Sequence, residues 1–566
     1  MSGALAHQAR GSGAMPRRGY RQAAGPGTGA RSFVSGLKTA YFGSALYRLT
    51  LGGRVPDSLD FDPADPYPGE ALRGDALFQG RFSFAGYDIV APNRPLWEPV
   101  GAPPPWIEEM HAFGWLRHFR ANGGETARRH ARALVGDWIS HYGTWHPVMW
   151  RPDILGYRIA SWLQNAAFLL NGGDESFRTM FFDCLARQAR HLGRTGVENV
   201  AGARRIAALK GMLYACVCLP RGEKRLDAVL KRLDTELRRQ ILADGGHVER
   251  SPAVQAMVLA DLAETRKLLL DANRLPSEAL ISAIDRMAPM LRTFRHGDGG
   301  LALFNGATEM SAESVEQVLT LADARGRALS GAPHSGFQRL SAGRTLVLVD
   351  AGVPPTLGDV AHAGTLSFEM SAGRQRLVVN CGAMPGGDAQ WRRALAGTPA
   401  HSTLTIGDTD SAVFAEGGGA LRRPGEVQCA RNESEGDVWI DARHDGYLAS
   451  HGAIHRRRLY LAAGGDDLRG EDSLISPERY RVTIRFHLHP DVQASQVRDG
   501  STILLRPPGG MGWRFRTAGA EVTLTESVYF GAAGQRRRSE QILLTAEAGG
   551  DLPPLKWAFR KYPGGR

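Results

Sequence analysis

Hydrophobic periodicity changes once along this chain, and that change constrains the fold more than any other feature. From Trp106 to about Ala324, apolar residues recur at three- and four-residue spacing in segments separated by short Gly, Pro or Asn breaks. After Gly331, apolar residues alternate with polar ones and turn residues are frequent. A run of helices followed by a run of strands predicts two segregated domains and not an alternating α/β fold.

The two halves predict two kinds of packing. Amphipathic helices joined by short loops pack as antiparallel hairpins, whereas short strands at regular spacing form a β-sandwich or stacked antiparallel sheets. A chain of 566 residues has room for both. We predict a disordered basic arm (1–32), a mixed segment with a short strand pair within Gly80–Pro92 (33–105), a helical domain (106–330) and a sheet domain (331–566).

The charge balance is basic. The chain carries a formal net charge of +11, and its first acidic residue is Asp57. A basic protein attracts polyanions such as nucleic acids, acidic glycans and anionic membrane surfaces, although an arginine-rich coding bias explains the charge equally well. No RNP, zinc-knuckle or helix-turn-helix pattern accompanies it, so nucleic acid is not expected as a partner.

Several familiar chemistries lack their motifs. The sequence contains no GxSxG elbow, HExxH, P-loop or strand-associated GxGxxG, which disfavours common hydrolases, zinc proteases and nucleotide-binding enzymes. The five cysteines show no disulfide or zinc-finger spacing, so free thiols are expected. No apolar run is long enough for a transmembrane helix, and the basic N-terminal stretch lacks the apolar core of a cleavable signal peptide.

Two motifs in the helical half carry candidate site residues. Asn199, in GVENV, lies at an expected helix start, where an N-cap role explains it equally well. The segment DGGHVERSP places His247, Glu249 and Arg250 just before a Ser-Pro helix start. Helix N-termini favour anions, and arginine suits a substrate carboxylate. A turn with a local salt bridge is the alternative explanation.

The sheet half offers a second set of polar candidates. His362, Asn380 and His401 each lie at the end of an expected strand, and imidazoles presented by neighbouring strand ends can bind zinc. Tyr447 lies in the polar stretch HDGYLASHGAIHRRR, and His296 lies in the linker FRHGDGGLALFNG. For all of these, hydrogen bonding within the fold is the simpler explanation.

A colinear set of segments spans residues from about 110 to 410: GVENV, QILADGGHVERSP, GDGGLALFNG, SGFQRL with LVLVDAG, HAGTLSFEM, LVVNCG and AHSTLTI. In this order they resemble the heparinase II/III family of polysaccharide lyases. The resemblance implies an incomplete α/α toroid followed by a multi-layer antiparallel β-sandwich, with a groove between them. It also implies cleavage of uronate-containing glycans by β-elimination.

β-Elimination requires three groups. The uronate carboxylate must be neutralised so that the enolate-like intermediate is stabilised, a base must take the C5 proton, and an acid must protonate the leaving oxygen. The resemblance places Asn199 at the position that addresses the carboxylate. It places Val254 and Val360 where the family has the Tyr and His that transfer protons.

The resemblance also implies a structural zinc ion. His362 and His401 match two of its ligands, and Asn380 stands where the family has Asp. An amide in place of a carboxylate removes a ligand charge, so we expect weakened zinc binding.

Two main hypotheses follow. The first is a polysaccharide lyase for an acidic glycan, in which Asn199 and Arg250 bind the carboxylate, His247 transfers protons with Glu249 beside it, and Tyr447 contacts substrate. The second, motivated by the two valines, is a non-catalytic glycan-binding or envelope-polysaccharide assembly protein on the same scaffold. A nucleic-acid-binding protein is the third, motivated by charge alone. The resemblance implies the periplasm or cell envelope, while the lack of a cleavable signal leaves the cytoplasm open.

Overall fold

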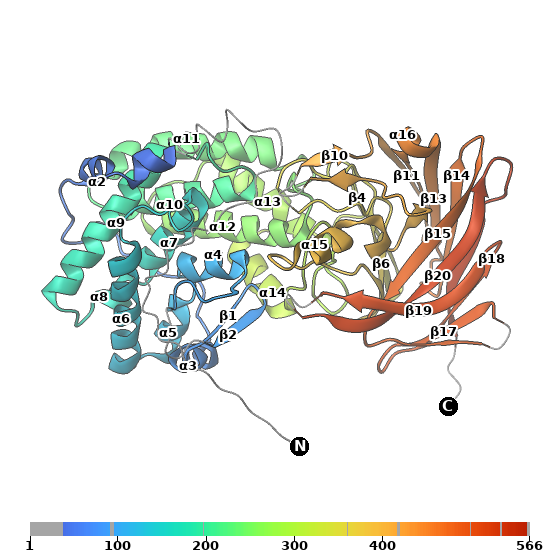
Figure 1. Ribbon diagram of the computed structural model, residues 1–566, viewed down its shortest axis with the longest axis horizontal. Helices are drawn as coiled ribbons and strands as arrows, with labels where there is room; N and C mark the ends of the chain where they lie inside the picture. The colour runs from blue at the N-terminus through green and yellow to red at the C-terminus, as the bar shows by residue number, and fades with distance from the viewer. Residues whose placement is uncertain are drawn as a thin grey trace, which may run out of the picture.

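The helical and sheet halves form two bodies side by side in the computed structural model (Figure 1). The structure describes residues 38–90, 96–195, 197–358, 360–415, 419–497, 500–531 and 535–562. The basic arm expected at 1–32 lies outside the described residues. Within these ranges, no helix has the length and apolar character needed to cross a membrane.

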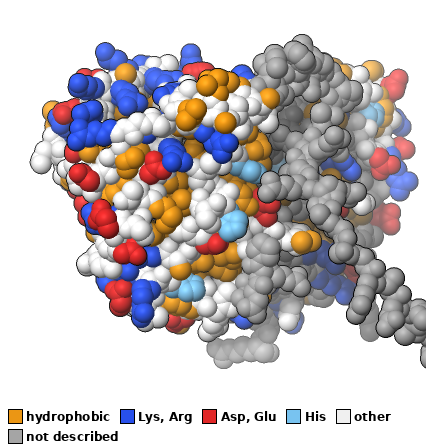
Figure 2. Space-filling model, turned by 60° about the vertical axis from the view of Figure 1, so that its left-hand side comes forward, with side chains coloured by type: hydrophobic (Ala, Val, Ile, Leu, Met, Phe, Trp, Pro, Cys, Tyr) orange, Lys and Arg blue, Asp and Glu red, His pale blue; other side chains and the backbone are white. Residues whose placement is uncertain are grey.

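Helices α2 to α14 build the first body, with one small hairpin of strands inserted. They are α2 (Ala45–Leu51), α3 (Ala71–Phe78), α4 (Pro104–Ala112), α5 (Leu116–Asn122), α6 (Gly124–Tyr142), α7 (Pro152–Gln164), α8 (Ala166–Leu170), α9 (Glu175–Thr195), α10 (Ala203–Cys218), α11 (Glu223–Gln240), α12 (Pro252–Asp271), α13 (Glu278–Thr293) and α14 (Ala312–Ala322). The face shown in Figure 2 gathers Lys and Arg side chains along its upper edge.

Helical periodicity explains how these helices pack. In α11, the buried residues Leu226, Val229, Leu233 and Leu237 follow one another at three- and four-residue spacing, so they form one apolar stripe. Helices α7 and α10 pack closely at Gly211, where a Cβ atom would collide with the backbone of α7. Small residues at this crossing let the two backbones touch.

Two local predictions are confirmed. Helix α12 begins at Pro252 with Ser251 in the N-cap position, although the Ser251 side chain makes no capping hydrogen bond. The expected strand pair forms an antiparallel hairpin of β1 (Arg81–Phe84) and β2 (Tyr87–Val90).

Two large antiparallel sheets build the second body. One has the order β19-β20-β15-β7-β6-β5-β4-β3, with β8 also paired to β15. Its strands are β3 (Gly331–Ala332), β4 (Phe337–Ala342), β5 (Thr345–Asp350), β6 (Phe368–Ala372), β7 (Gln375–Val379), β8 (Leu404–Ile406), β15 (Arg479–Leu488), β19 (Glu521–Tyr529) and β20 (Arg537–Gly549).

The other sheet has the order β11-β12-β13-β14-β21-β18-β17-β16. Its strands are β11 (Val427–Ser434), β12 (Asp437–Tyr447), β13 (Ala453–Leu461), β14 (Asp467–Ile475), β16 (Gln493–Gln496), β17 (Thr502–Arg506), β18 (Gly512–Ala518) and β21 (Leu555–Tyr562). A small pair, β9 (Val413–Phe414) with β10 (Ala420–Arg422), and the short helices α15 (Ala389–Ala396) and α16 (Leu448–His451) lie outside these sheets.

The apolar faces of the two sheets meet in one core. Phe368 of β6 stacks on Trp557 of β21, with ring centroids 5.6 Å apart and planes 7° from parallel. Phe486 of β15 meets the same Trp557 ring edge-on, at 4.8 Å. Aromatic contacts between opposing sheets are typical of a β-sandwich. The predicted order of helices first and antiparallel sheets second is confirmed.

Candidate functional site

The segment between α11 and α12 folds back on itself as a tight turn. Ile241 and His247 pair as an antiparallel bridge, and Gly245 turns the chain with φ +84°, where a Cβ atom would collide with the carbonyl of Arg286. This turn carries the three adjacent candidates His247, Glu249 and Arg250 into the junction between the two bodies.

His247 is enclosed by the protein. The residue is only 1% exposed. Its Nε2 lies 3.0 Å from Oε1 of Gln240, and its Nδ1 accepts a hydrogen bond from the backbone N–H of Glu249. Burial lowers the pKa of this imidazole to about 4. Both ring nitrogens are therefore engaged by the protein, and proton transfer by His247 stays a prediction.

Glu249 holds the start of α10. Its Oε1 accepts a hydrogen bond of 2.8 Å from the backbone N–H of Ala203, in the first turn of that helix. A Cβ atom on either Gly202 or Gly358 would collide with the Glu249 carboxylate. The carboxylate therefore satisfies a helix N-terminus and fills the space beside two glycines, and the catalytic role expected of Glu249 stays a prediction.

Arg250 joins the helical body to the sheet body. Its guanidinium pairs with the buried Asp350 at the end of β5 and donates to the backbone carbonyls of Ser335 (2.7 Å) and Val353 (2.9 Å). It also lies 4.7 Å over the ring of Phe337. All three guanidinium nitrogens have protein acceptors that link the two bodies, and the expected contact with a substrate carboxylate stays a prediction.

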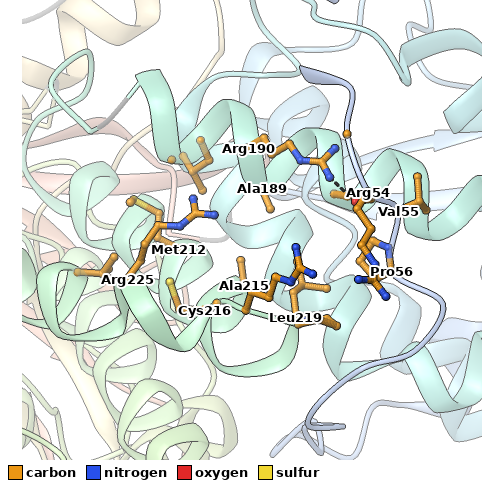
Figure 3. Close-up of a pocket in the computed structure, with 18 of the residues that line it drawn as sticks. Arg54, Val55, Pro56, Ala189, Arg190, Met212, Ala215, Cys216, Leu219 and Arg225 are labelled. Atoms are coloured by element: carbon orange, nitrogen blue, oxygen red, sulfur yellow. Dashed lines mark hydrogen bonds between the residues drawn. The ribbon is translucent and has the colours of Figure 1, made fainter. Parts of the chain in front are cut away.

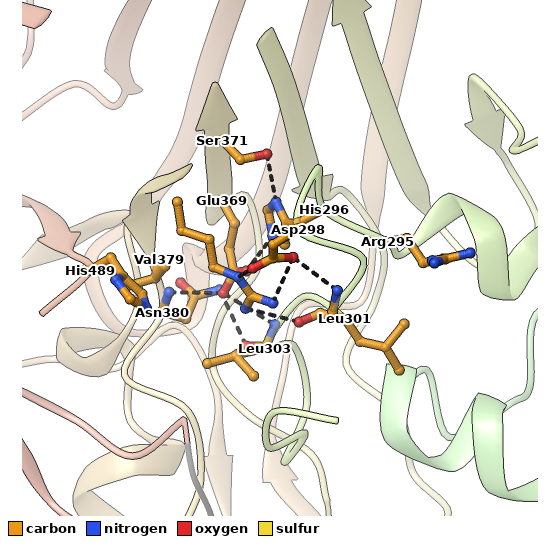
Figure 4. A network of polar contacts seen from close by, with 12 residues as sticks. Arg295, His296, Asp298, Leu301, Leu303, Glu369, Ser371, Val379, Asn380 and His489 are labelled. Atoms are coloured by element: carbon orange, nitrogen blue, oxygen red, sulfur yellow. Dashed lines mark hydrogen bonds and ion pairs between the residues drawn. The ribbon is translucent and has the colours of Figure 1, made fainter. Parts of the chain in front are cut away.

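A second polar network crosses the same junction (Figure 4). His296, in the turn after α13, contacts Oε2 of Glu369 through Nε2 (2.9 Å) and Oγ of Ser371 through Nδ1 (3.0 Å). Asp298 in the same turn pairs with Arg376 of β7 at 2.8 Å. Buried polar groups need such partners, and here the partners come from the other body.

Tyr447 lies inside the sheet body. Its side chain is fully buried at the end of β12, and its hydroxyl donates to the carbonyl of Leu404 at 2.8 Å. Burial raises the pKa of this phenol. The substrate contact expected for Tyr447 is therefore not supported by its position.

The three residues expected to bind zinc make polar contacts within the protein. Nδ1 of His362 lies 3.2 Å from Nε2 of His401, so the two imidazoles bond to each other. The Asn380 side chain accepts from the backbone N–H of Ser402 at 3.0 Å and donates to the carbonyl of Leu303. The described residues include no group of three or more His, Cys, Asp or Glu side chains suited to a metal. Structural zinc sites have four ligands, so zinc binding at His362, Asn380 and His401 stays a prediction.

Asn199 is the candidate that remains exposed. It lies in the turn between α9 and α10, and its Oδ1 is 3.5 Å from Nζ of Lys38. The N-cap of α10 is Gly202, so Asn199 does not have the capping role that offered an alternative explanation.

Comparisons with known proteins identify the scaffold. Residues 324–558 match the model of the heparinase II/III-like C-terminal domain. The chain superimposes on a crystal structure of heparinase III with a TM-score of 0.72 at 15% identity, over 94% of this chain and 91% of that one. The chain belongs to the heparinase II/III-like family. Its helical body is the α/α toroid of that fold, and its sheets are the β-sandwich.

Further relatives extend the match. A mutant of the heparan sulfate lyase HepC from Pedobacter heparinus superimposes with a TM-score of 0.62 at 15% identity, over 95% of this chain and 90% of that one. In sequence, the chain is 32% identical to the FtsZ-localized protein C of Caulobacter vibrioides (strain NA1000 / CB15N), over 93% of this chain and 94% of that protein.

Aliphatic side chains occupy the positions that the family resemblance assigns to proton transfer. Val254 lies in the first turns of α12 and is 8% exposed. Val360 packs against the apolar core of the toroid, and a Cβ atom on Gly306 would lie 3.0 Å from its Cβ. Neither side chain has a group that can accept or donate a proton, and both contribute to packing.

The toroid also contains a buried charged cluster that was not predicted from the sequence. Lys210 of α10 pairs with Asp261 (2.9 Å) and Glu264 (2.7 Å) of α12, and Tyr157 donates to Asp261. The sequence contains a pattern that could have predicted this cluster. A lysine lies inside an apolar helix, and two acidic residues three positions apart share one face of another helix, so the two helices can bring these charges together.

Proposed function

We propose that this protein is a non-catalytic member of the heparinase II/III-like family that works at the cell-division site. The observation that carries the proposal is the pair Val254 and Val360 at the positions of the family's proton carriers. β-Elimination without a base and an acid loses the rate that proton transfer provides, about 10²- to 10⁴-fold for each group.

The remaining candidates do not replace those carriers. His247 has both ring nitrogens engaged by the protein, and the Arg250 guanidinium is held by Asp350 and two backbone carbonyls. Asn199 is exposed, but an amide alone supplies hydrogen bonds and no proton transfer. These contacts support a scaffold that has kept its architecture without the chemistry.

The proposed location at the division site rests on the relative whose name contains FtsZ. That protein is similar to this chain over nearly its whole length, which supports a shared role at the division site. We therefore propose that the protein localises with FtsZ.

A polysaccharide lyase is the second candidate, and the fold favours it. Of the two solved relatives named above, one is a heparinase III and the other a heparan sulfate lyase by their titles. The net charge of +11 suits an acidic glycan in either a cleaving or a merely binding role. In this alternative the protein cleaves or holds a uronate-containing polymer with residues that the family does not ordinarily use.

Two measurements separate the candidates. Absorbance of the unsaturated uronate product is followed over a panel of acidic glycans at several pH values, with a heparinase III as positive control. Co-sedimentation with assembled FtsZ and the position of a fluorescent fusion in dividing cells are measured in parallel. We expect no product and a division-site signal. Product formation from any glycan would refute the non-catalytic assignment, and a signal spread over the whole cell would refute the division role.

A further inference from the structure

A cavity of about 510 Å³ opens on the toroid between α9, α10, α11 and the segment 53–57. None of the candidate residues at the toroid–sandwich junction lines it. Its apolar wall includes Ala189, Met212, Ala215, Cys216 and Leu219 (Figure 3). Ligand pockets for small molecules typically enclose about 300–1,000 Å³ and combine apolar walls with a few polar groups.

The polar lining of this cavity is almost entirely cationic. It includes the arginines Arg54, Arg190, Arg221, Arg225 and Arg232, and a single acidic residue, Asp57. Arg232 is paired with Glu198. For the other four arginines, no ion pair with a carboxylate is present in the part of the chain that the structure describes. A cleft lined by one sign of charge concentrates counter-ions of the opposite sign.

One of these arginines builds the wall of the cavity. Arg190 of α9 donates to the carbonyl of Leu51 at 2.8 Å and to that of Arg54, which fixes the segment over the helix (Figure 3). Burial lowers the pKa of Arg190, the Asp183 carboxylate opposes that shift, and the nearby Arg194, Arg187 and Arg225 add to it. Asp183 is itself ion-paired with Arg187, so within the described residues Arg190 brings a positive charge to the wall without an ion pair of its own.

Arg225 reaches into the cavity from α11. Its guanidinium extends toward the middle of the space in Figure 3, and a Cβ atom on Gly193 would lie 3.3 Å from its Nη1, so the glycine leaves room for it against α9. Burial raises the pKa of the Cys216 thiol and Arg225 opposes that rise, which is consistent with a guanidinium close to the cavity floor. Arg54 and Arg221 are exposed at the rim.

We propose that this cavity binds a phosphate monoester with an apolar body. The apolar body lies along Met212, Ala215 and Leu219, and the phosphate is held by Arg225 with Arg54 or Arg221. Guanidinium groups match phosphate in bidentate geometry. A phosphate monoester carries a charge of about −1.5 to −2 near neutral pH. It therefore neutralises several arginines without ion pairs better than a carboxylate, which carries a single negative charge.

The probe is hexyl phosphate, compared with inorganic phosphate and hexanol by calorimetry on the full-length protein. A lipid headgroup presents the same chemistry, so flotation with vesicles of phosphatidic acid in phosphatidylcholine forms a second arm. Cys216 provides a reporter inside the cavity, because its alkylation by iodoacetamide is measured by mass spectrometry with and without hexyl phosphate. Cys429, which is also half-buried but lies on β11, is the internal control.

We expect hexyl phosphate to bind at least tenfold more tightly than inorganic phosphate or hexanol, and to slow alkylation of Cys216 without affecting Cys429. Arg225→Glu should weaken this binding at least tenfold, and Ala189→Leu, which fills the cavity without changing charge, should weaken it as well. Arg481→Glu, an exposed arginine on β15, is the matched control and should bind as the wild type does.

Three outcomes would overturn the proposal. They are the absence of hexyl phosphate binding, equal affinity for hexyl and inorganic phosphate, and binding that Arg225→Glu and Ala189→Leu both leave unchanged. Vesicle binding counts in favour of a lipid source when Arg225→Glu reduces it at least tenfold. Vesicle binding without soluble-probe binding, and insensitive to Arg225, counts against the cavity.

Discussion

Arg250 offers the sharpest test of whether a residue that looks catalytic is structural. The substitution Arg250→Met removes the partner of Asp350, which is 3% exposed, together with two hydrogen bonds to backbone carbonyls. Removing one member of a buried ion pair costs about 3–5 kcal/mol, because the other charge is left buried and unpaired. The whole stability of a typical domain is about 5–15 kcal/mol, so the loss should be large.

Urea unfolding, followed by tryptophan fluorescence, measures this loss. With a slope of about 2 kcal/mol/M, we expect the midpoint of Arg250→Met to fall by roughly 1.5–2.5 M. Arg481→Met is the control at an exposed site and should stay within about 0.5 kcal/mol of the wild type. In the double variant Arg250→Met/Asp350→Leu no charge is stranded, so part of the lost stability should return.

One result would refute the structural role of Arg250. If Arg250→Met unfolds at the wild-type urea concentration but loses affinity for an acidic glycan, then Arg250 acts on substrate and its link between the two bodies does not stabilise the fold. Failure of the double variant to recover any stability would show that the cost comes from lost packing and not from the stranded carboxylate.

Three further predictions follow from buried groups. Lys210→Met should lower the free energy of unfolding by about 3–5 kcal/mol at neutral pH. The loss should be smaller in acid, because burial raises the pKa of Asp261 and favours its neutral form. Urea unfolding midpoints at pH 7 and pH 5 test this difference. The pKa of His247 is lowered from its ordinary value to about 4 in the folded protein. Its contribution to the free energy of unfolding, about 3 kcal/mol, is therefore present above pH 6.5 and is lost as the pH falls toward 4. His247→Gln should flatten the pH dependence of stability in that range, and an unchanged slope would contradict this prediction. Zinc should leave the Tm of the wild type unchanged but raise the Tm of Asn380→Asp, because this substitution restores the carboxylate of the family's ligand set. Scanning calorimetry with and without zinc measures both values. A zinc-dependent shift in the wild-type Tm would contradict this prediction.

The fold could be predicted because periodicity is a local property. The three- and four-residue spacing in α11 and the Ser-Pro start of α12 depend on neighbouring residues alone, and both are observed. The match of motifs in order then supplied the toroid and the sandwich, which periodicity cannot distinguish from other helical and sheet architectures.

The candidate site was less predictable because its partners are distant in sequence. Arg250 meets Asp350, a hundred residues later, and His296 meets Glu369. Residue type showed that these groups needed partners, but not whether a substrate or the protein supplied them. Val254 and Val360 were informative in the opposite way, since a side chain without a titratable group excludes proton transfer whatever surrounds it.

The polar lock at the junction of toroid and sandwich also bears on how such proteins are recognised. Arg250, Asp350, His296 and Glu369 hold the two bodies together, so a lineage that abandoned catalysis would still be selected to keep them. A sequence signature centred on these positions therefore reports shared ancestry and shared architecture. Evidence for enzymatic activity has to come from the proton carriers, which the architecture is free to lose.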